Sequence, residues 1–557
     1  MLSRPIHPSS RGDTIPSTDL QSRHHSLIRT AIPATPHSCL MKSLCLTALV
    51  ALSSHALADV RLASIFTEHA VLQRDRPLPV WGWAEPNEQV VVTLGPATAK
   101  TTTADDGRWM VNLAPQSATS QPLTLTVTGK NSVQINDILL GDVWLCSGQS
   151  NMDWALGGCQ APEDIAAATL PLIRHFRTEY NFASTPATTV KGQWAVCSPD
   201  TASNFSAVGF YFARTIQAAT GVPVGLVTNA VGGTNIELWM SQDILLNTPS
   251  LKPYARQMRE SLDTYQQQLT SSLPAIEQWT RESRVAQQAD RPLPMPPAWP
   301  EYPFGERVAR PRCVTLHNGH IAPLIPMAMR GVLWYQGESN ADDSLYFEKK
   351  SAMLASWRQW FQHESLPFYF VQLAAFEKPS DDPANLGWGS IRDQQRRCLT
   401  IPHTGMASAI DLGEADDIHP KNKADVGARL ALWALANEYN QPEKIASGPL
   451  FRDLKIEGAA ARISFDSIGD GLITARKTGR APAVEEKNSP LRRFAIAGAD
   501  RQWFWATAVI EGATVLVSSP DVPTPVAVRY ACSTNPEGAN LYNRNGLPAS
   551  PFRTDNW

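Results

Sequence analysis

The chain has little charge and no long apolar run. Asp, Glu, Lys and Arg make up 18% of its 557 residues, and the formal net charge is −3. The sequence contains no block of lysine and arginine of the kind that follows a phosphate backbone. After residue 58, no apolar stretch approaches the roughly 20 residues that cross a bilayer. The sequence therefore predicts no nucleic-acid partner and no membrane span.

Cysteine is also scarce. The six cysteines that follow residue 58 are Cys146, Cys159, Cys197, Cys313, Cys398 and Cys532. Their wide spacing matches neither a metal-binding pattern nor a dense disulfide framework. Two interpretations stay open: one disulfide between Cys159 and Cys197, or a set of buried free thiols.

The first 58 residues have the character of a leader rather than of a folded domain. Residues 1–40 show no hydrophobic periodicity, so we expect them to be disordered or to lie upstream of the true start. Residues 41–58 begin with Met41-Lys42, continue through a short apolar stretch and end in Ala-Leu-Ala. This is the pattern of a secretory signal peptide. We expect a mature chain that begins near Asp59 and is periplasmic or extracellular.

The hydrophobic pattern divides the remaining chain into three parts. Residues 59–137 alternate apolar and polar positions in short runs, which predicts an N-terminal β-sandwich domain. Residues 138–441 alternate apolar strands with helical stretches, which predicts an α/β catalytic domain around a parallel sheet. Residues 442–557 return to a strand pattern. This C-terminal β region could stand alone or complete the first sandwich.

Within the α/β part, the expected strands lie at residues 143–146, 224–230, 328–335, 368–373 and 406–412. The expected helices lie at residues 206–219, 345–361 and 423–439. Residues 245–312 interrupt this order with a polar helical stretch at 254–288 and a proline-rich run that cannot continue a helix. We interpret them as an insertion, which is either a lid, a dimer arm or a passive surface excursion.

Ser150 is the most informative residue. The apolar run that begins at Gly141 breaks at Gly148 and leaves the Ser150 hydroxyl at the exit of a predicted strand. A serine hydroxyl is a poor nucleophile unless a base takes its proton, and an imidazole suits that role near neutral pH. His419, in the run Asp-Asp-Ile-His-Pro, is the candidate base. The pair predicts a serine esterase.

A carboxylate is expected at the other ring nitrogen of His419. Asp416 lies three residues earlier and is our first choice as the group that fixes the tautomer. Asp417 is the second choice, and Asp411 and Glu414 are further competitors. A lone serine after Gly-Gln is usually a turn residue and a lone Asp-x-x-His is often accidental, so the prediction depends on the conjunction of both motifs.

Acyl transfer also needs hydrogen-bond donors for the developing oxyanion. Gly232 and Gly233 follow one predicted strand, and paired glycines allow backbone N–H groups to approach a substrate. Gln336 and Asn340 follow another strand and carry amide donors. The carboxyl ends of strands in such sheets are where ligands bind. The alternative interpretation of the glycine pair is a tight turn.

Four segments together resemble the sialate O-acetylesterase family of the SGNH-type hydrolases. The segments that carry the resemblance are residues 141–152, 224–239, 318–340 and 411–420. The resemblance implies an SGNH-hydrolase-like, flavodoxin-like parallel sheet flanked by β-sandwich-type regions. This chain has Val231 before the paired glycines, where family members often have an aromatic residue, so the wall of the pocket differs.

The resemblance also implies roles for individual residues. Ser150 would be the nucleophile, and His419 the general base and then acid, oriented by Asp416. The implied oxyanion donors are the Ser150 N–H, an N–H of Gly232 or Gly233, and the Gln336 side chain. Glu338 and Asn340 would support the site from behind.

The implied activity is removal of O-acetyl groups from a sugar or glycan, with no metal or organic cofactor. O-acetylated sialic acid is the substrate that the family name suggests, and acetylated xylan or another plant polysaccharide is the alternative. A different class of function also stays open. The β regions and the 17 tryptophans could belong to a non-catalytic carbohydrate-binding surface protein. The sequence does not indicate an oligomeric state.

Overall fold

The computed structural model describes residues 59–304 and 313–557. The predictions for residues 1–40, for the signal peptide at 41–58 and for the last part of the insertion lie outside the described residues. Within the described parts of the chain, no helix is both long and apolar enough to cross a membrane.

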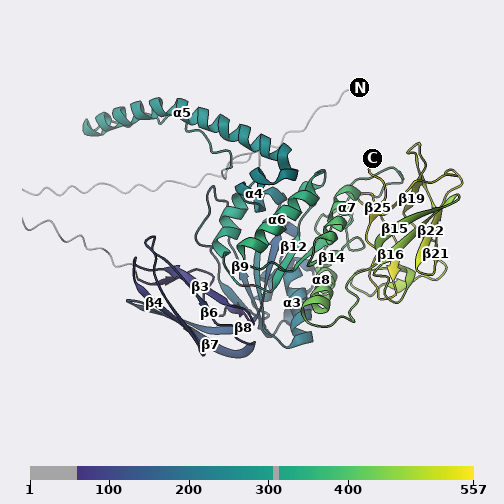
Figure 1. The fold of residues 1–557 in the computed structure, drawn as a ribbon, viewed down its shortest axis with the longest axis horizontal. Coiled ribbons are helices and arrows are strands. Elements are labelled where there is room, and N and C mark those ends of the chain that lie inside the picture. The colour runs from purple at the N-terminus through teal and green to yellow at the C-terminus, as the bar shows by residue number, and fades with distance from the viewer. Residues whose placement is uncertain (1–58, 305–312) are drawn as a thin grey trace, which may run out of the picture. The chain divides into compact units, whose positions relative to one another are not determined.

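The N-terminal region contains two groups of antiparallel strands. Its strands are β1 (Arg61–Leu62), β2 (Val71–Gln73), β3 (Leu78–Trp83), β4 (Gln89–Leu94), β5 (Ala97–Thr102), β6 (Arg108–Leu113), β7 (Thr119–Thr128) and β8 (Ser132–Gly148). One group has the order β1-β3-β6, and the other pairs β5, β4, β7 and β8 (Figure 1). Strand β2 joins β8 in parallel. Every second residue of β6 is buried, which fixes the face that it turns to the core.

Strand β8 belongs to two regions at once. Its first part pairs antiparallel with β7, and its second part pairs in parallel with β11 and β12 of the central sheet. Residues 132–137 are partly exposed, whereas all residues from Ile138 to Gly148 are buried. The domain boundary that the sequence suggests at residue 138 therefore marks the change in burial, but it falls inside one unbroken strand.

The central sheet carries the candidate site. Its further strands are β9 (Leu170–Arg177), β10 (Trp194–Cys197), β11 (Val224–Ala230), β12 (Gly331–Tyr335), β13 (Phe368–Gln372) and β14 (Thr404–Ser408). The spatial order is β10-β9-β11-β8-β12-β13-β14, and only β10 runs antiparallel to its neighbour on this path. Numbered along the chain, the strands β11, β8, β12, β13 and β14 have the order 2-1-3-4-5 of flavodoxin-like sheets. All five predicted strands of the sheet are present.

Helices complete this α/β part. They are α1 (Ser150–Asp153), α2 (Pro162–Ala166), α3 (Ala207–Thr220), α4 (Gln242–Asn247), α5 (Lys252–Gln288), α6 (Tyr346–Trp360), α7 (Gly389–Arg397) and α8 (Lys423–Glu438). Side chains that cap their first turns start α3 and α8 where the sequence predicts them: Ser206 accepts from Gly209 N and Asn422 accepts from Asp425 N.

Both faces of the central sheet are covered. On one face, Trp144 of β8 packs against Phe212 of α3, with ring centroids 4.8 Å apart, and α3 packs against α8. Trp334 pairs with Ser147, an odd number of residues after Trp144, so it points to the other face. There it contacts Trp357 of α6.

The predicted helical stretch at 254–288 corresponds to α5, which has 37 residues. Only Ala255, Met258 and Ala286 of this helix are buried. The indole N–H of Trp279 donates to the carbonyl of Pro294 at 2.8 Å, so the proline-rich run turns back along the helix. Whether this segment is a lid, a dimer arm or a passive surface excursion stays a prediction.

The C-terminal region forms its own sheets. Its strands are β15 (Leu450–Glu457), β16 (Ala460–Asp466), β17 (Leu472–Arg476), β18 (Val484–Glu485), β19 (Phe494–Ala497), β20 (Trp503–Trp505), β21 (Thr507–Glu511), β22 (Thr514–Ser518), β23 (Ala527–Tyr530), β24 (Leu541–Asn543) and β25 (Phe552–Arg553). Within the described residues, these strands pair only with one another. The region therefore does not complete the first sandwich.

The cysteines are buried free thiols. All six described cysteines are unpaired. The bridge suggested between Cys159 and Cys197 is wrong: the Cys159 thiol donates to the carbonyl of Ala155 and the Cys197 thiol to that of Ala168. Burial raises the pKa of Cys197 to about 12, so this thiol is protonated at neutral pH.

A buried guanidinium joins the α/β part to the C-terminal region. Arg392 of α7 is fully buried, and it donates to the carbonyl oxygens of Leu373 and Ala374 at 2.9 and 2.6 Å. It also donates to the carbonyls of Ser533 and Thr534 at 2.7 and 2.8 Å. Burial lowers the pKa of Arg392 to about 9.

We expect Arg392→Gln to lower the free energy of unfolding by about 3 kcal/mol, because it leaves buried carbonyl oxygens without donors. Urea unfolding followed by tryptophan fluorescence measures this. The matched control is Arg452→Gln: Arg452 lies in an exposed ion pair with Asp466 at 3.4 Å and should change stability by less than about 0.5 kcal/mol. Equal effects of the two substitutions would contradict the structural role of Arg392.

Candidate active site

Ser150 is the first residue of α1, and only Gln149 separates it from the end of β8. The turn between them requires Gly148, whose φ is +131°. A Cβ atom there would lie 2.2 Å from the carbonyl oxygen of Tyr335, so no other residue fits. Gln149 N donates to the same oxygen at 2.9 Å. The ends of β8 and β12 are thus locked together, and the nucleophile candidate has a fixed backbone.

The structure brings Ser150 and His419 together. The Ser150 hydroxyl and Nε2 of His419 are 2.8 Å apart, although 269 residues separate them in the chain. His419 lies on the loop between β14 and α8, and Ser150 lies at the end of β8. Both positions are at the carboxyl ends of central strands, where the sequence pattern places them.

Asp417, and not Asp416, lies beside the imidazole. Oδ1 of Asp417 is 3.3 Å from Nδ1 of His419 and also accepts from the His419 backbone N–H at 2.8 Å. Asp416 is exposed at the tip of a turn that Glu414 and Asp417 close. An aspartate side chain readily accepts from the backbone two residues ahead, and this local turn outweighs the three-residue spacing. The first choice of Asp416 is therefore corrected to Asp417.

The other carboxylates of this loop are engaged elsewhere. Asp411 forms two hydrogen bonds with the Arg429 guanidinium, at 2.6 and 2.7 Å, and accepts from the Tyr542 hydroxyl at 3.0 Å. Glu414 accepts from the backbone N–H of Lys421 at 2.7 Å. These contacts hold the loop in shape on both sides of His419.

Trp154 covers the imidazole. Its ring stacks on His419 with centroids 4.7 Å apart and an angle of 18° between the planes. The Lys421 ammonium lies 4.8 Å from the Trp154 ring and pairs with Asp417. Neither Trp154 nor Lys421 was predicted from the sequence. The signal available was the spacing of Trp154 four positions after Ser150, which places it one helical turn away.

The electrostatics suit a base at Nε2. Partial burial lowers the pKa of His419 below its ordinary value of 6.5, and it outweighs the neighbouring carboxylate of Asp417, which acts to raise it. Hydrogen bonds from Lys421 and from the His419 backbone hold the pKa of Asp417 below its ordinary value. At neutral pH the imidazole is therefore uncharged, and the carboxylate of Asp417 beside Nδ1 favours the tautomer that leaves Nε2 free to accept the Ser150 proton.

Behind the pair, Asn151 ties the histidine loop to the end of β12. Its amide donates to Glu338 Oε1 at 2.6 Å and to the carbonyl of Ile418 at 3.1 Å, and its oxygen accepts from the buried Lys423 ammonium. Burial lowers the pKa of Lys423 to about 8 and raises that of Glu338. Glu338 thus contacts Asn151, the residue after Ser150, and supports the nucleophile through this neighbour.

Gly232 borders the nucleophile. A methyl group at this position would lie 3.3 Å from Cβ of Ser150, whereas one at Gly233 would meet no atom within 4 Å. Gly233 has a φ of +67°, a left-handed backbone conformation that favours glycine over other residues. Val231, before the pair, is buried and donates to the carbonyl of Gly148 at 3.1 Å.

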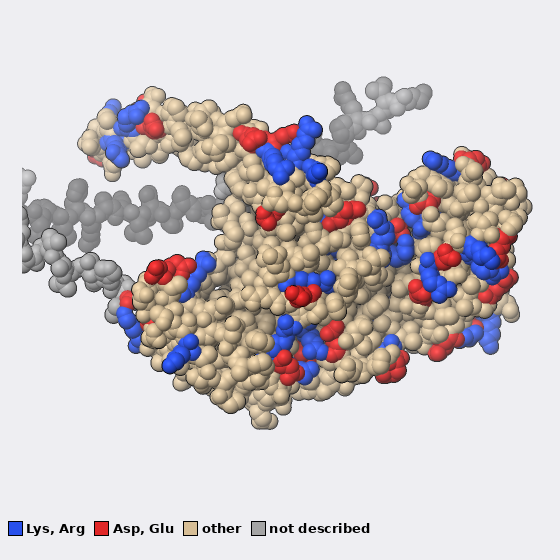
Figure 2. All heavy atoms as spheres, viewed as in Figure 1, with Lys and Arg blue, Asp and Glu red and all other residues tan. Residues whose placement is uncertain are grey.

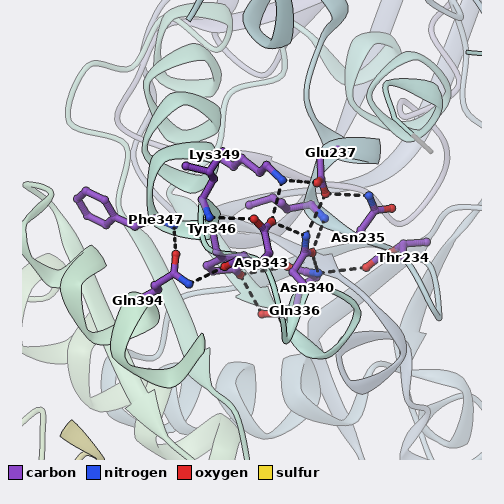
Figure 3. Close-up of polar contacts among 12 residues, drawn as sticks. Thr234, Asn235, Glu237, Gln336, Asn340, Asp343, Tyr346, Phe347, Lys349 and Gln394 are labelled. Carbon is purple, nitrogen blue, oxygen red and sulfur yellow. Dashed lines mark hydrogen bonds and ion pairs between the residues drawn. The ribbon is translucent and has the colours of Figure 1, made fainter. Parts of the chain in front are cut away.

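Gln336 is not free to donate to an oxyanion. It is fully buried, and its amide hydrogens are directed to the carbonyl of Thr234 at 3.1 Å and to Oδ1 of Asn340 at 2.7 Å. Its oxygen accepts from the Tyr346 hydroxyl at 3.0 Å. Figure 3 shows these contacts from Thr234 to Gln336 and Asn340. The prediction of Gln336 as an oxyanion donor is therefore corrected. Through its bond to Thr234, the Gln336 side chain stabilises the turn that contains Gly232 and Gly233.

Asn340 belongs to a second polar cluster, formed with Glu237, Asp343 and Lys349, which was not predicted from the sequence (Figure 3). Its amide donates to Glu237 and Asp343 at 3.0 Å each, and its oxygen accepts from Ile236 N at 2.9 Å. The Lys349 ammonium lies 2.5 Å from Glu237 and 2.8 Å from Asp343. Glu237, a carboxylate within the apolar run from Ile236 to Met240, was a signal for this cluster.

Within the described residues, no group of three or more His, Cys, Asp and Glu side chains could hold a metal ion. On the face drawn in Figure 2, basic and acidic side chains are interspersed and do not form one continuous patch.

Known proteins resemble this chain over most of its length. A family model described as carbohydrate esterase, sialic acid-specific acetylesterase, matches residues 140–288 and 299–436. The sialate O-acetylesterase of Mus musculus is 30% identical over 547 residues, which cover 88% of this chain and 94% of the relative. The Homo sapiens protein of the same name is 28% identical over 548 residues, covering 88% and 92%.

A solved structure agrees with these relatives. The carbohydrate acetylesterase XAC1771 from Xanthomonas citri superimposes with a TM-score of 0.72 at 35% identity, over 90% of this chain and all of that one. The geometry and the relatives lead to one conclusion: this chain is an ester hydrolase that belongs to the carbohydrate esterase family of sialic acid-specific acetylesterases.

Proposed function

We propose that the protein is an exported serine esterase that removes O-acetyl groups from a carbohydrate through an acetyl-serine intermediate. The observation that carries this proposal is the 2.8 Å contact between the Ser150 hydroxyl and Nε2 of His419, with Asp417 at the opposite ring nitrogen. A non-catalytic carbohydrate-binding protein requires no such arrangement.

In the first half of the reaction, Ser150 Oγ attacks the acetyl carbonyl carbon while its proton passes to Nε2 of His419. The resulting imidazolium is stabilised by Asp417, and the backbone N–H groups of Ser150 and Gly232 are the candidate donors to the oxyanion. The tetrahedral intermediate then collapses: the bond to the sugar oxygen breaks, and this oxygen takes the proton from His419. Acetyl-serine and the free sugar alcohol result.

In the second half, water attacks the acetyl-serine carbonyl and gives a proton to His419. Collapse breaks the bond to Ser150 Oγ, which recovers the proton, and acetate leaves. All proton transfers use the same imidazole nitrogen, so one base serves both halves.

We also propose the SGNH-type hydrolase fold. The 2-1-3-4-5 order of the central strands supports it, as do the serine after the first of them and the histidine before the last helix. Export is supported by the signal-like pattern of residues 41–58.

For the sugar, the names of the relatives favour an O-acetylated sialic acid. A neutral plant polysaccharide such as acetylated xylan is the second candidate, and the cavity described below favours a neutral sugar.

Ser150→Ala should lower kcat for p-nitrophenyl acetate at least about 10³-fold, because it removes the nucleophile. Release of p-nitrophenol measures the rate. Ser344, an exposed serine, is the control: Ser344→Ala should retain the wild-type rate. Turnover by Ser150→Ala at a rate close to that of wild type would refute the proposed mechanism.

The two neighbouring aspartates provide a matched pair. Asp417→Asn should lower kcat about 10⁴-fold, because the amide does not stabilise the imidazolium or fix its tautomer. Asp416→Asn should change kcat less than about threefold, since this side chain is exposed and away from the ring. Steady-state kinetics of both variants decide the assignment, and the opposite ranking would restore Asp416 as the partner.

The stack of Trp154 on His419 predicts a shift in pH dependence. The base must be uncharged, so kcat/KM should rise with pH through the pKa of His419, with a midpoint below 6.5 because burial lowers this pKa. Trp154→Ala exposes the imidazole, stabilises its charged form and should move the midpoint to higher pH, whereas Trp154→Phe should restore most of the wild-type profile. A midpoint that stays fixed or falls in Trp154→Ala would contradict this cause.

A further inference from the structure

We propose that the open cavity beside Ser150 holds the sugar of the substrate, and that its charge selects a neutral O-acetylated sugar over one that carries a carboxylate. The inference rests on the proposed function and names the class of substrate that this site takes.

The cavity adjoins the nucleophile through shared walls. It has a volume of about 510 Å³, within the usual range of small-molecule sites, and Gly233 and Ser339 line it. Gly233 follows Gly232, which borders Ser150. The Ser339 backbone N–H donates to the side chain of Gln149, the residue before the nucleophile, at 3.4 Å. An ester whose carbonyl lies at Ser150 must place its alcohol part close by, and this cavity offers the space.

The lining of the cavity has an excess of carboxyl groups. Among the described residues that line it, Glu237, Glu338, Asp342 and Asp343 are acidic, and Lys349 is the one cation. Burial acts to lower the pKa of Lys349, but Glu237 and Asp343 outweigh it and raise the pKa, so the ammonium stays charged.

The positive charge of Lys349 is already paired with two carboxylates of the protein. Lys349 Nζ is held by Glu237 and Asp343 at 2.5 and 2.8 Å, and Asn340 donates to the same two carboxylates (Figure 3). A substrate carboxylate would have to displace one of these partners. The hydroxyl groups of a neutral sugar, in contrast, can donate to the carboxylate oxygens and accept from the remaining ammonium hydrogen.

The charges on the histidine side of Ser150 do not supply a cation either. Lys421 pairs with Asp417, and Arg177 pairs with Asp153 at 2.5 Å. Lys423 is buried and donates to Asn151. Lys423 acts on Glu338, whose pKa is raised by burial, so this carboxyl group contributes least to the charge of the cavity. Glu237, Asp342 and Asp343 still outnumber Lys349, and a carboxylate that enters the cavity meets like charge at short range.

The test compares one sugar in two charge states. Acetate release is measured for 9-O-acetyl-N-acetylneuraminic acid, for its carboxamide and for an O-acetylated methyl xyloside, at low ionic strength. We expect the wild-type enzyme to hydrolyse the carboxamide and the xyloside with kcat/KM at least tenfold above that of the carboxylate. Added salt should narrow the difference, because it screens the repulsion.

The variant Asp342→Lys probes the cause. Asp342 lines the cavity and is exposed, so its charge is reversed without disturbing the buried cluster. We expect it to raise kcat/KM for the carboxylate substrate about tenfold relative to the carboxamide. Asp105→Lys, at an exposed position of the N-terminal β region, should leave this ratio unchanged.

A wild-type enzyme that hydrolyses the carboxylate as well as the carboxamide, or better, would overturn the inference. So would an unchanged ratio in Asp342→Lys. Failure of the underlying esterase activity is distinguishable, because in that case neither p-nitrophenyl acetate nor any of the three sugars would release its product with wild-type enzyme.

Discussion

The hydrogen bonding of strand β8 is the constraint on which the rest of the structure depends. One backbone pairs with β7 in the N-terminal region and then, without a break, with β11 and β12 in the central sheet. Its last residue, Gly148, must approach the carbonyl of Tyr335 more closely than any side chain permits. Since the strand is fixed on both edges, Ser150 starts its helix at one defined place, and the other groups are arranged around it.

The sequence predicted the features that depend on local pattern. Five strands of the central sheet, β8, β11, β12, β13 and β14, and the helices α3, α6 and α8 follow from hydrophobic periodicity, and all are present. Strands β9 and β10 at one edge of the sheet were not predicted. Ser150 and His419 could be paired because their two motifs occur together in one chain, although either motif alone is often accidental. Gly232 was predicted near them because paired glycines after a strand allow backbone N–H groups to approach a substrate, and the structure places it beside Ser150.

Two assignments required the folded chain. Asp416 and Asp417 differ by one position, and only the turn that closes at Asp417 determines which carboxylate reaches the ring. Gln336 looked available because its partner Thr234 lies 102 residues away. Spacing along the chain contains no information on such pairings, so a polar side chain that serves the scaffold cannot be distinguished from one that faces a substrate.

The separation of Ser150 and His419 along the chain has a consequence for biosynthesis. A nascent polypeptide emerges with its N-terminus first, and domains begin to fold before translation ends. The hydroxyl is synthesised 269 residues before the imidazole that activates it. Every shorter intermediate on the ribosome consequently holds a serine without its base, so a chain that stops before the histidine loop lacks the partner that activates the hydroxyl.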